Sequence, residues 1–144
     1  MSVLPRWFEQ LRWSRVWSVA YLANNRGEIP EQPGCYVFTE TASGLCPKRV
    51  LYVGKAKNLH KRLGGYLVDY KRTTPTRHKG RAFIFEQRDR AGDHATFVRW
   101  VPYGGKPGEL ETNLCDLLWP DCTDRWEIHD LWNDEEGIDP RLLG

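Results

Sequence analysis

Residues 50–66 read VLYVGKAKNLHKRLGGY, a strand pattern followed directly by a helix pattern. The β-forming side chains at positions 50–53 predict a strand that Gly54 ends, and the alanine, lysines and leucines after it predict a helix that starts at position 55 or 56. One face of that helix carries Lys55, Leu59, Arg62 and Tyr66. Two cations and a phenol near the positive end of a helix dipole predict a site for an anion such as phosphate.

Composition favours one folded domain with a polyanionic partner. The chain has 144 residues, 40% of them hydrophobic, which is enough for a sizeable core. Its net charge of +2 conceals two regions of opposite sign. Residues 45–90 hold thirteen Lys/Arg against three Asp/Glu, a net of +10, whereas residues 107–144 hold two against eleven, a net of −9. This asymmetry predicts a polyanion that contacts the basic middle of the chain.

The cysteine pattern and the apolar runs indicate a cytoplasmic protein. Cysteines at positions 35, 46, 115 and 122 form no C-x-x-C pair and lie in or beside apolar segments, so we expect reduced packing residues rather than disulfides or zinc ligands. No apolar run in the sequence approaches the ~18 residues of a membrane span. The run at 16–23 is short and contains Ser18, so we interpret it as mature structure rather than a leader.

The N-terminal segment carries several tryptophans. Pro5 suits a first helical turn and the NNRG sequence at 24–27 reads as a stop, which predicts a helix over residues 5–24. Its apolar side chains cover more than one stripe. Packing on the domain core is the first interpretation, and a contact with a second copy or a partner protein is the alternative.

Two more strands are predicted on either side of this basic region. Residues 35–39 follow a Pro-Gly turn and are close enough to 50–53 for an antiparallel hairpin, and residues 95–103 form the third strand. Alternation places Tyr36 and Tyr52 on one sheet face if the register allows it. Residues 82–90 are compatible with helix or strand, and residues 125–132 predict a short helix.

A leucine pattern predicts a helix over residues 108–118. Glu111 lies three residues before Leu114 and seven before Leu118, at the border of the buried stripe. A carboxylate held there, near the core, is suitably placed for chemistry.

Four spaced motifs, in this order, resemble the GIY-YIG nucleases, with the N-terminal nuclease domain of bacterial excinuclease C the nearest likeness. They are PGCYVF at 33–38, LYVGKAKNL at 51–59, KRL at 61–63 with Tyr66, and LETNL at 110–114. The resemblance implies an α+β fold in which a small three-stranded antiparallel sheet is flanked by helices. It places the nuclease domain at residues 31–122, an N-terminal helical extension at 1–30 and an acidic tail at 123–144.

The resemblance also implies the roles of individual residues. The catalytic set is expected to be Tyr36, Tyr52, Lys55, Arg62, Tyr66 and Glu111, with Glu111 as the ligand for Mg²⁺ or Mn²⁺. Two motif lysines and the basic segment that follows are expected to bind nucleic acid, at Lys57, Lys61, Lys71, Arg72, Arg77, His78, Lys79 and Arg81.

These expectations describe an endonuclease that hydrolyses DNA phosphodiester bonds with one metal ion, on duplex, nicked or branched DNA. Tyr52 is the expected proton acceptor, with a pKa lowered by Lys55 and the metal, and Tyr36 is expected to position the phosphate or the water. Two other classes stay open. One is a non-catalytic nucleic-acid-binding module that retains the fold. The other is a structural protein whose tryptophan-rich N-terminus makes the functional contact, either with a second copy to form a homodimer or with a protein partner.

Overall fold

The computed structural model describes residues 5–42, 45, 50–72, 78–118 and 120. The helix predicted at 125–132 and the acidic tail at 123–144 lie outside the described residues. The side chains of Arg72 and Arg77, two of the predicted nucleic-acid contacts, also lie outside them.

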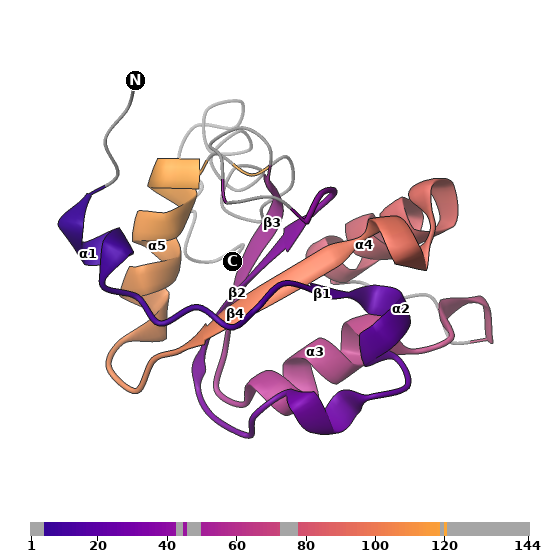
Figure 1. Ribbon diagram of the computed structural model, residues 1–144, viewed down its shortest axis with the longest axis horizontal. Coiled ribbons are helices and arrows are strands. Elements are labelled where there is room, and N and C mark those ends of the chain that lie inside the picture. The colour runs from indigo at the N-terminus through magenta and orange to yellow at the C-terminus, as the bar shows by residue number, and fades with distance from the viewer. Residues whose placement is uncertain (1–4, 43–44, 46–49, 73–77, 119, 121–144) are drawn as a thin grey trace, which may run out of the picture.

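The centre of the molecule is an antiparallel sheet with the strand order β1-β4-β2-β3 (Figure 1). Its strands are β1 (Trp17–Ser18), β2 (Gly34–Thr39), β3 (Val50–Ala56) and β4 (Phe97–Pro102). The three predicted strands are confirmed, as is the antiparallel hairpin of β2 and β3. The sheet has four strands rather than three, because β1 adds a two-residue strand at the edge beside β4.

Helices cover both faces of this sheet, which confirms the predicted α+β class (Figure 1). On one face lie α1 (Arg6–Glu9) and α5 (Pro107–Leu118). On the other lie α2 (Val19–Leu22), α3 (Leu59–Leu67) and α4 (Lys79–Ala91). Within the described residues, three short 3-10 helices connect these elements, at η1 (Arg26–Glu28), η2 (Tyr70–Arg72) and η3 (Asp93–Ala95).

Strand alternation divides the core into two hydrophobic clusters. Tyr36 and Phe38 of β2 face α2, α3 and α4, whereas Cys35 and Val37 face α1 and α5. Helix α3 packs on the first face through Leu59 and Leu63, and α5 packs on the second through Leu114. The sheet is therefore buried on both sides.

The predicted helix over residues 5–24 is wrong. Helix α1 ends at Glu9, and the chain then runs along β4 as an extended segment before α2 begins at Val19. Ser14 holds this segment by donating its N–H to the Trp100 carbonyl at 2.7 Å and accepting the Trp100 N–H on Oγ at 3.0 Å. Hydrogen bonds to an otherwise unpaired strand edge outweigh the helical periodicity of the sequence.

The boundary between the strand at position 50 and the next helix also differs from the prediction. Strand β3 continues through Gly54 to Ala56, because Lys55 pairs with Cys35 and Gly54 with Tyr36. Asn58 then caps α3, its Oδ1 accepting the Lys61 N–H at 3.1 Å. Lys55 is consequently a strand residue and does not share a helical face with Arg62.

The remaining predictions for this region are settled by the structure. Residues 82–90 are helical, as part of α4, and the helix predicted at 108–118 is α5. Cys35 and Cys115 are buried free thiols, as predicted; positions 46 and 122 lie outside the described residues. Among the described residues, no helix combines the length and the apolar character that crossing a membrane requires.

Candidate active site

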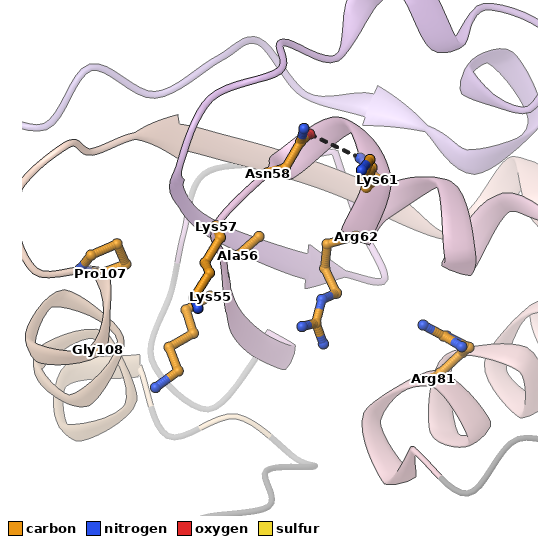
Figure 2. Close-up of a pocket in the computed structure, with 9 residues that line it drawn as sticks. All are labelled: Lys55, Ala56, Lys57, Asn58, Lys61, Arg62, Arg81, Pro107 and Gly108. Atoms are coloured by element: carbon orange, nitrogen blue, oxygen red, sulfur yellow. Dashed lines mark hydrogen bonds between the residues drawn. The ribbon is translucent and has the colours of Figure 1, made fainter.

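A basic cleft lies where β3 passes into α3 and meets the start of α5 (Figure 2). Its volume is about 780 Å³. Five cations line it, from β3, α3, α4 and the turn between β3 and α3: Lys55, Lys57, Lys61, Arg62 and Arg81. Asn58, Pro107 and Gly108 complete the wall together with Ala56. The concentration of positive charge suits a phosphate backbone.

Lys55 and Arg62 reach this cleft from different elements (Figure 2). The Lys55 side chain leans toward α5, where its Nζ lies 3.3 Å from the point that a Cβ on Gly108 would occupy. Arg62 extends from the second turn of α3, and Arg81 faces it from α4 (Figure 2). The structure thus brings the two predicted catalytic cations together, although the shared helical face that predicted their proximity does not exist.

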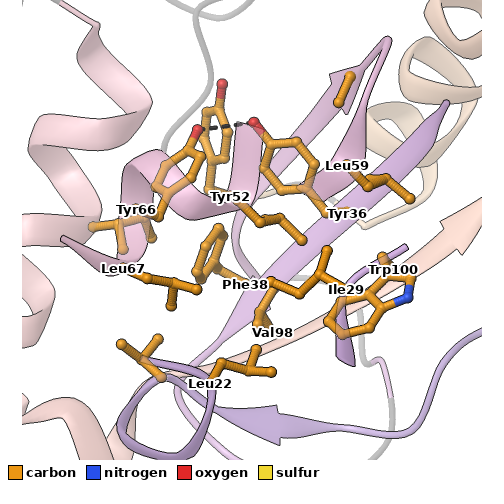
Figure 3. Close-up of a cluster of buried hydrophobic side chains, with 14 of the residues drawn as sticks. Leu22, Ile29, Tyr36, Phe38, Tyr52, Leu59, Tyr66, Leu67, Val98 and Trp100 are labelled. Carbon is orange, nitrogen blue, oxygen red and sulfur yellow. Dashed lines mark hydrogen bonds between the residues drawn. The ribbon is translucent and has the colours of Figure 1, made fainter. Parts of the chain in front are cut away.

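The hydroxyl groups of three tyrosines, from β2, β3 and α3, meet at one end of the first hydrophobic cluster (Figure 3). Tyr36 and Tyr66 share a hydrogen bond of 2.8 Å between their Oη atoms. The ring centroid of Tyr52 lies 6.1 Å from that of Tyr36 and 6.3 Å from that of Tyr66. The predicted common face of Tyr36 and Tyr52 is confirmed, since Tyr52 pairs with Phe38, two residues along β2 from Tyr36.

Two glycines make room for these phenols. A Cβ on Gly54 would collide with the ring and hydroxyl of Tyr36, and one on Gly80 would lie 2.7 Å from the Tyr52 Oη. Neither position therefore has space for a side chain. The rings of Tyr36 and Tyr52 pack directly on backbone, one on β3 and the other on the first turn of α4.

Burial controls the ionisation of two of the phenols. It raises the pKa of Tyr36 well above the usual value, and the neighbouring Tyr66 adds to the rise, while the Arg62 charge opposes it. Burial likewise raises the pKa of Tyr66, again against the charge of Arg62. Because a raised tyrosine pKa favours the neutral phenol, Tyr36 and Tyr66 stay protonated at neutral pH in this state. The cation that acts on both is Arg62 rather than Lys55.

Helix α4 is fastened to α3 by arginines. Arg88 is buried and donates from Nη1 to the carbonyls of Tyr66 and Val68 at 2.8 Å each, which satisfies carbonyls at the end of α3. Its Nε and Nη2 donate to Asp93. The Arg81 guanidinium lies over the Tyr66 ring, with Cζ 5.9 Å from the centroid. These contacts fix the wall of the cleft that α4 provides.

Glu111 lies one turn into α5, beyond the two residues of that helix that line the cleft. Its side chain is partly buried, as the leucine pattern predicts. Its negative charge raises the pKa of Tyr36, after burial and Tyr66, and helps burial to raise the pKa of Cys35 to about 12. Glu111 is therefore close enough to influence both β2 residues electrostatically, beside the cleft and the phenols.

The carboxylates and other donors near the cleft limit the kind of metal ion that could bind there. In the described parts of the chain no group of three or more His, Cys, Asp or Glu side chains is arranged to hold one. A single partly buried carboxylate beside a phosphate-sized cleft does fit a hard cation that keeps most of its waters, as Mg²⁺ usually does. The residues present therefore fit one hydrated divalent cation at Glu111 and do not fit a cage of protein ligands.

The predicted nucleic-acid contacts do not all lie together. Lys57, Lys61 and Arg81 line the cleft. His78 begins α4 beside it, and Lys79 is exposed on the first turn of that helix. Lys71 lies elsewhere, 3.9 Å from the Asp89 carboxylate.

Sequence reasoning missed the specific position of His78, which it grouped with the basic segment. The imidazole packs against the rings of Tyr52 and Tyr66, with centroids 6.4 and 6.1 Å away. The sequence carries little signal for this position, because histidine is not among the usual N-cap residues. Residues 82–90 were also compatible with a strand, so no helix start was predicted at His78.

Comparisons with known proteins point to one family. The model of the UvrC-like GIY-YIG domain matches residues 32–87, which include β2, β3 and α3. UvrABC system protein C of Paenarthrobacter aurescens is 44% identical over 93 residues, 65% of this chain and 11% of that protein. The protein of the same name from Corynebacterium jeikeium is 45% identical over 93 residues, with the same two shares.

A shorter match has higher identity. UvrABC system protein C of Acidothermus cellulolyticus is 54% identical over 43 residues, 30% of this chain and 6% of that protein. The chain thus spans 11% or less of the length of these curated relatives. No solved structure matches the chain. Over residues 32–87 the chain is thus a relative of the UvrC-like GIY-YIG domain, the family that its sequence motifs resemble.

Proposed function

We propose that this domain is a metal-dependent endonuclease that hydrolyses phosphodiester bonds in DNA. The observation that carries the proposal is one cleft in which Arg62 and Lys55 lie beside a cluster of buried phenols and next to the carboxylate-bearing helix α5. Cations bind the phosphate, a carboxylate binds a divalent ion, and phenols donate or accept protons. Metal-assisted hydrolysis of a phosphodiester can use all three functions.

The cations of the cleft bind and orient the substrate. Lys57 and Lys61 lie on its rim, are exposed and hold the DNA backbone through charge. Arg62 lies deeper and is only partly exposed, so its guanidinium donates to the scissile phosphate as negative charge develops in the in-line attack. Lys55 holds a second phosphate oxygen from the side of α5.

Glu111 would hold the divalent ion, Mg²⁺ or Mn²⁺ by the preference of these ions for oxygen ligands. When bound, such an ion supplies charge neutralisation at the phosphate and a positive field that favours an ionised phenol. Glu111 itself is held by α5, which Leu110 and Leu114 pack against the sheet.

The three phenols have different roles in proton transfer. Tyr36 and Tyr66 share a hydrogen bond and remain neutral, so they take part as hydrogen-bonding groups and not as bases. We assign the proton acceptor for the attacking water to Tyr52, as the motif implies. A phenol with a usual pKa of ~10 needs positive charge nearby to accept a proton at neutral pH. Lys55 lies on the opposite face of β3 by alternation, so that charge is assigned to the bound cation rather than to Lys55.

A non-catalytic nucleic-acid-binding module is the second candidate, and the basic cleft alone would serve it. The burial of the tyrosine cluster favours catalysis over binding. Tyr36 and Tyr66 are 1% and 0% exposed, so they add little contact surface to bound DNA. A binding module needs the rim lysines but has no use for a hydrogen-bonded phenol pair beneath them.

Nicking of supercoiled plasmid DNA tests the proposal. The purified chain is incubated with Mg²⁺, with Mn²⁺ or with chelator, and single-stranded and branched oligonucleotides are assayed beside the plasmid. We expect cleavage in both metals and none in chelator. DNA binding without cleavage in either metal, on any of these substrates, would instead establish the binding module.

Assembly through the N-terminal segment is still proposed, but through different residues from those that the sequence suggested. The three tryptophans that suggested a dimer contact do not lie on one helix: Trp7 belongs to α1, Trp17 to β1, and Trp13 to the segment between them. Trp7 and Trp13 pack against the second hydrophobic cluster. Tyr21 of α2, 45% exposed and stacked on Trp17, is the more accessible aromatic side chain for a homodimer or protein partner.

A further inference from the structure

Arg81 is a cation of the cleft that packs on the backbone of a neighbouring helix. A Cβ on Gly65 of α3 would lie 2.8 Å from the Arg81 Nη2, 3.0 Å from its Cζ and 3.2 Å from its Nε. Because these three distances are nearly equal, the guanidinium lies face-on over Gly65. The Arg81 Cζ also lies 5.9 Å from the centroid of the Tyr66 ring. The Gly65 backbone and the Tyr66 ring therefore form a platform that fixes the plane of the guanidinium.

This packing gives Arg81 few of the partners that a structural arginine has. Among the described residues its buried Nε has no hydrogen-bond partner, and no ion pair joins Arg81 to a carboxylate. Arg88, further along the same helix, is the contrast, because two carbonyls at the end of α3 and the Asp93 carboxylate accept its N–H groups. A buried N–H without an acceptor lowers stability. Packing alone therefore does not explain an arginine at position 81.

The Arg81 guanidinium points into the cleft toward Arg62 (Figure 2). Two positive charges that face each other repel. A phosphate between them replaces this repulsion by attraction to both, and the planar N–H groups of a guanidinium match phosphate oxygens. The opposed arginines therefore indicate an anion site between α3 and α4, inside the cleft of the proposed nuclease.

We propose that Arg81 is a further catalytic residue, which holds the scissile phosphate from the side of α4 while Arg62 holds it from α3. Gly65 is a positioning residue, because the lack of a side chain there lets the guanidinium lie flat against α3. The inference rests on the proposed phosphodiesterase function and adds two residues to it. A donor fixed in place before the reaction stabilises the charge that develops in the transition state more than it tightens binding.

A substitution next to Arg81 tests the platform without removing its charge. Gly65→Ala places a methyl group too close to the guanidinium, which is the far end of a flexible side chain and can turn away at little cost to the fold. Gly64→Ala is the matched control, since its Cβ would lie 3.5 Å from the Arg26 Nη1, an ordinary contact outside the cleft. Both changes favour α3, because alanine is a better helix former than glycine.

Substitutions of Arg81 itself test the role of the guanidinium. Single-turnover cleavage and affinity for uncleaved DNA in chelator are measured for Arg81→Ala, Arg81→Lys and the control Arg90→Ala, which lies exposed on the same helix outside the cleft. We expect Arg81→Ala to cleave on the order of 10²-fold more slowly and to bind DNA within about threefold. Arg81→Lys should bind like the wild type and still cleave slowly, because an ammonium lacks the planar fork. A loss confined to affinity would overturn the catalytic role.

The two glycine variants should differ in rate although both remain folded. We expect Gly65→Ala to cleave about tenfold more slowly than Gly64→Ala. In an Arg81→Ala background, Gly65→Ala should cause no further loss, because the group that it displaces is already absent. Equal cleavage by the two glycine variants, or a Gly65→Ala effect that persists without the guanidinium, would overturn the role of the platform.

Inorganic phosphate gives a readout that needs no cleavage. At constant ionic strength, phosphate should raise the unfolding temperature of the wild type and of Gly64→Ala, and raise it much less in Gly65→Ala and Arg81→Ala. Equal stabilisation of all four proteins, or of none, contradicts the inference. The expected pattern in a protein that cleaves no DNA retains the anion site and refutes the proposed nuclease alone.

Discussion

Arg62 is a cation of the cleft whose charge acts on two buried phenols. It lines the cleft, faces His78 and acts on the ionisation of both Tyr36 and Tyr66. Its position follows from α3, where Leu59 and Leu63 are buried on one side and Arg62 turns toward the cleft. A planar guanidinium that offers several donors suits the oxygens of a phosphate better than a lysine would.

Arg62→Ala should lower the rate constant for cleavage by a factor on the order of 10² or more, because a donor positioned for the transition state is lost. DNA affinity should change far less, since one phosphate contact among several is modest. Single-turnover kinetics beside equilibrium binding separate the two effects. Arg26→Ala is the control, as Arg26 is exposed in η1 outside the cleft. Weaker binding with an unchanged rate constant would reassign Arg62 to the binding surface.

Residue positions were predictable from sequence where a simple period fixes them. Alternation along two neighbouring strands allowed Tyr36 and Tyr52 to share one face, and the observed register places them there. The leucine spacing placed Glu111 at the border of the buried stripe of α5. Lys55 was assigned to a helix because lysine and alanine are good helix formers. Its pairing with Cys35 depends on β2, which a local pattern does not contain.

At the scale of elements, the N-terminal segment shows how tertiary hydrogen bonds override local preference. The apolar residues between positions 8 and 22 have a spacing that suits a helix. Strand β4, however, pairs with β2 along one edge only and leaves its other edge open to the N-terminal segment. Ser14 and the pairing of Trp17 with Val98 use that edge. Ser18 then caps α2 by accepting the Tyr21 N–H at 3.1 Å. Serines favour such caps and turns over helix interiors, a signal that the apolar pattern outweighed in the prediction.

Ser14→Ala should destabilise the fold without changing the chemistry. It removes the oxygen that accepts the Trp100 N–H, and a buried donor left without a partner costs about 1–3 kcal/mol. Denaturant unfolding measures the loss, and cleavage by the folded protein should match the wild type. Ser14→Thr keeps the hydroxyl and should restore most of the stability. An Ala variant as stable as the wild type would show that the segment is held by its aromatic side chains instead.

At the scale of the whole molecule, the described basic residues are divided by the fold. Cations from β3, α3 and α4 converge on the cleft, whereas Lys71 lies beside Asp89. The charge count of residues 45–90 predicted a polyanion partner but not this division, because it sums over elements that face different ways. The path of the DNA is therefore proposed to follow the rim at Lys57 and Lys61.

The double substitution of Lys57 and Lys61 by alanine tests that path. If both side chains touch phosphate, the slope of log affinity against log salt should flatten by about two units. The control replaces Arg12 and Arg90, which are exposed, lie outside the cleft and change the net charge equally. DNA binding is measured over a range of salt concentrations. Equal slopes for the two double variants would show that the DNA binds to another face of the protein.

The central claim is that Glu111 holds the divalent ion for phosphodiester hydrolysis, and plasmid nicking by Glu111→Ala beside Glu109→Ala tests it most directly. Both residues lie on α5, but Glu109 is exposed and its carboxylate is 3.7 Å from the Lys106 amine. We expect Glu111→Ala to fold and bind DNA like the wild type and to show no nicking at ordinary Mg²⁺, while Glu109→Ala nicks normally. Nicking by Glu111→Ala at the wild-type rate would contradict the account, and loss of nicking in Glu109→Ala alone would assign the ion to that residue.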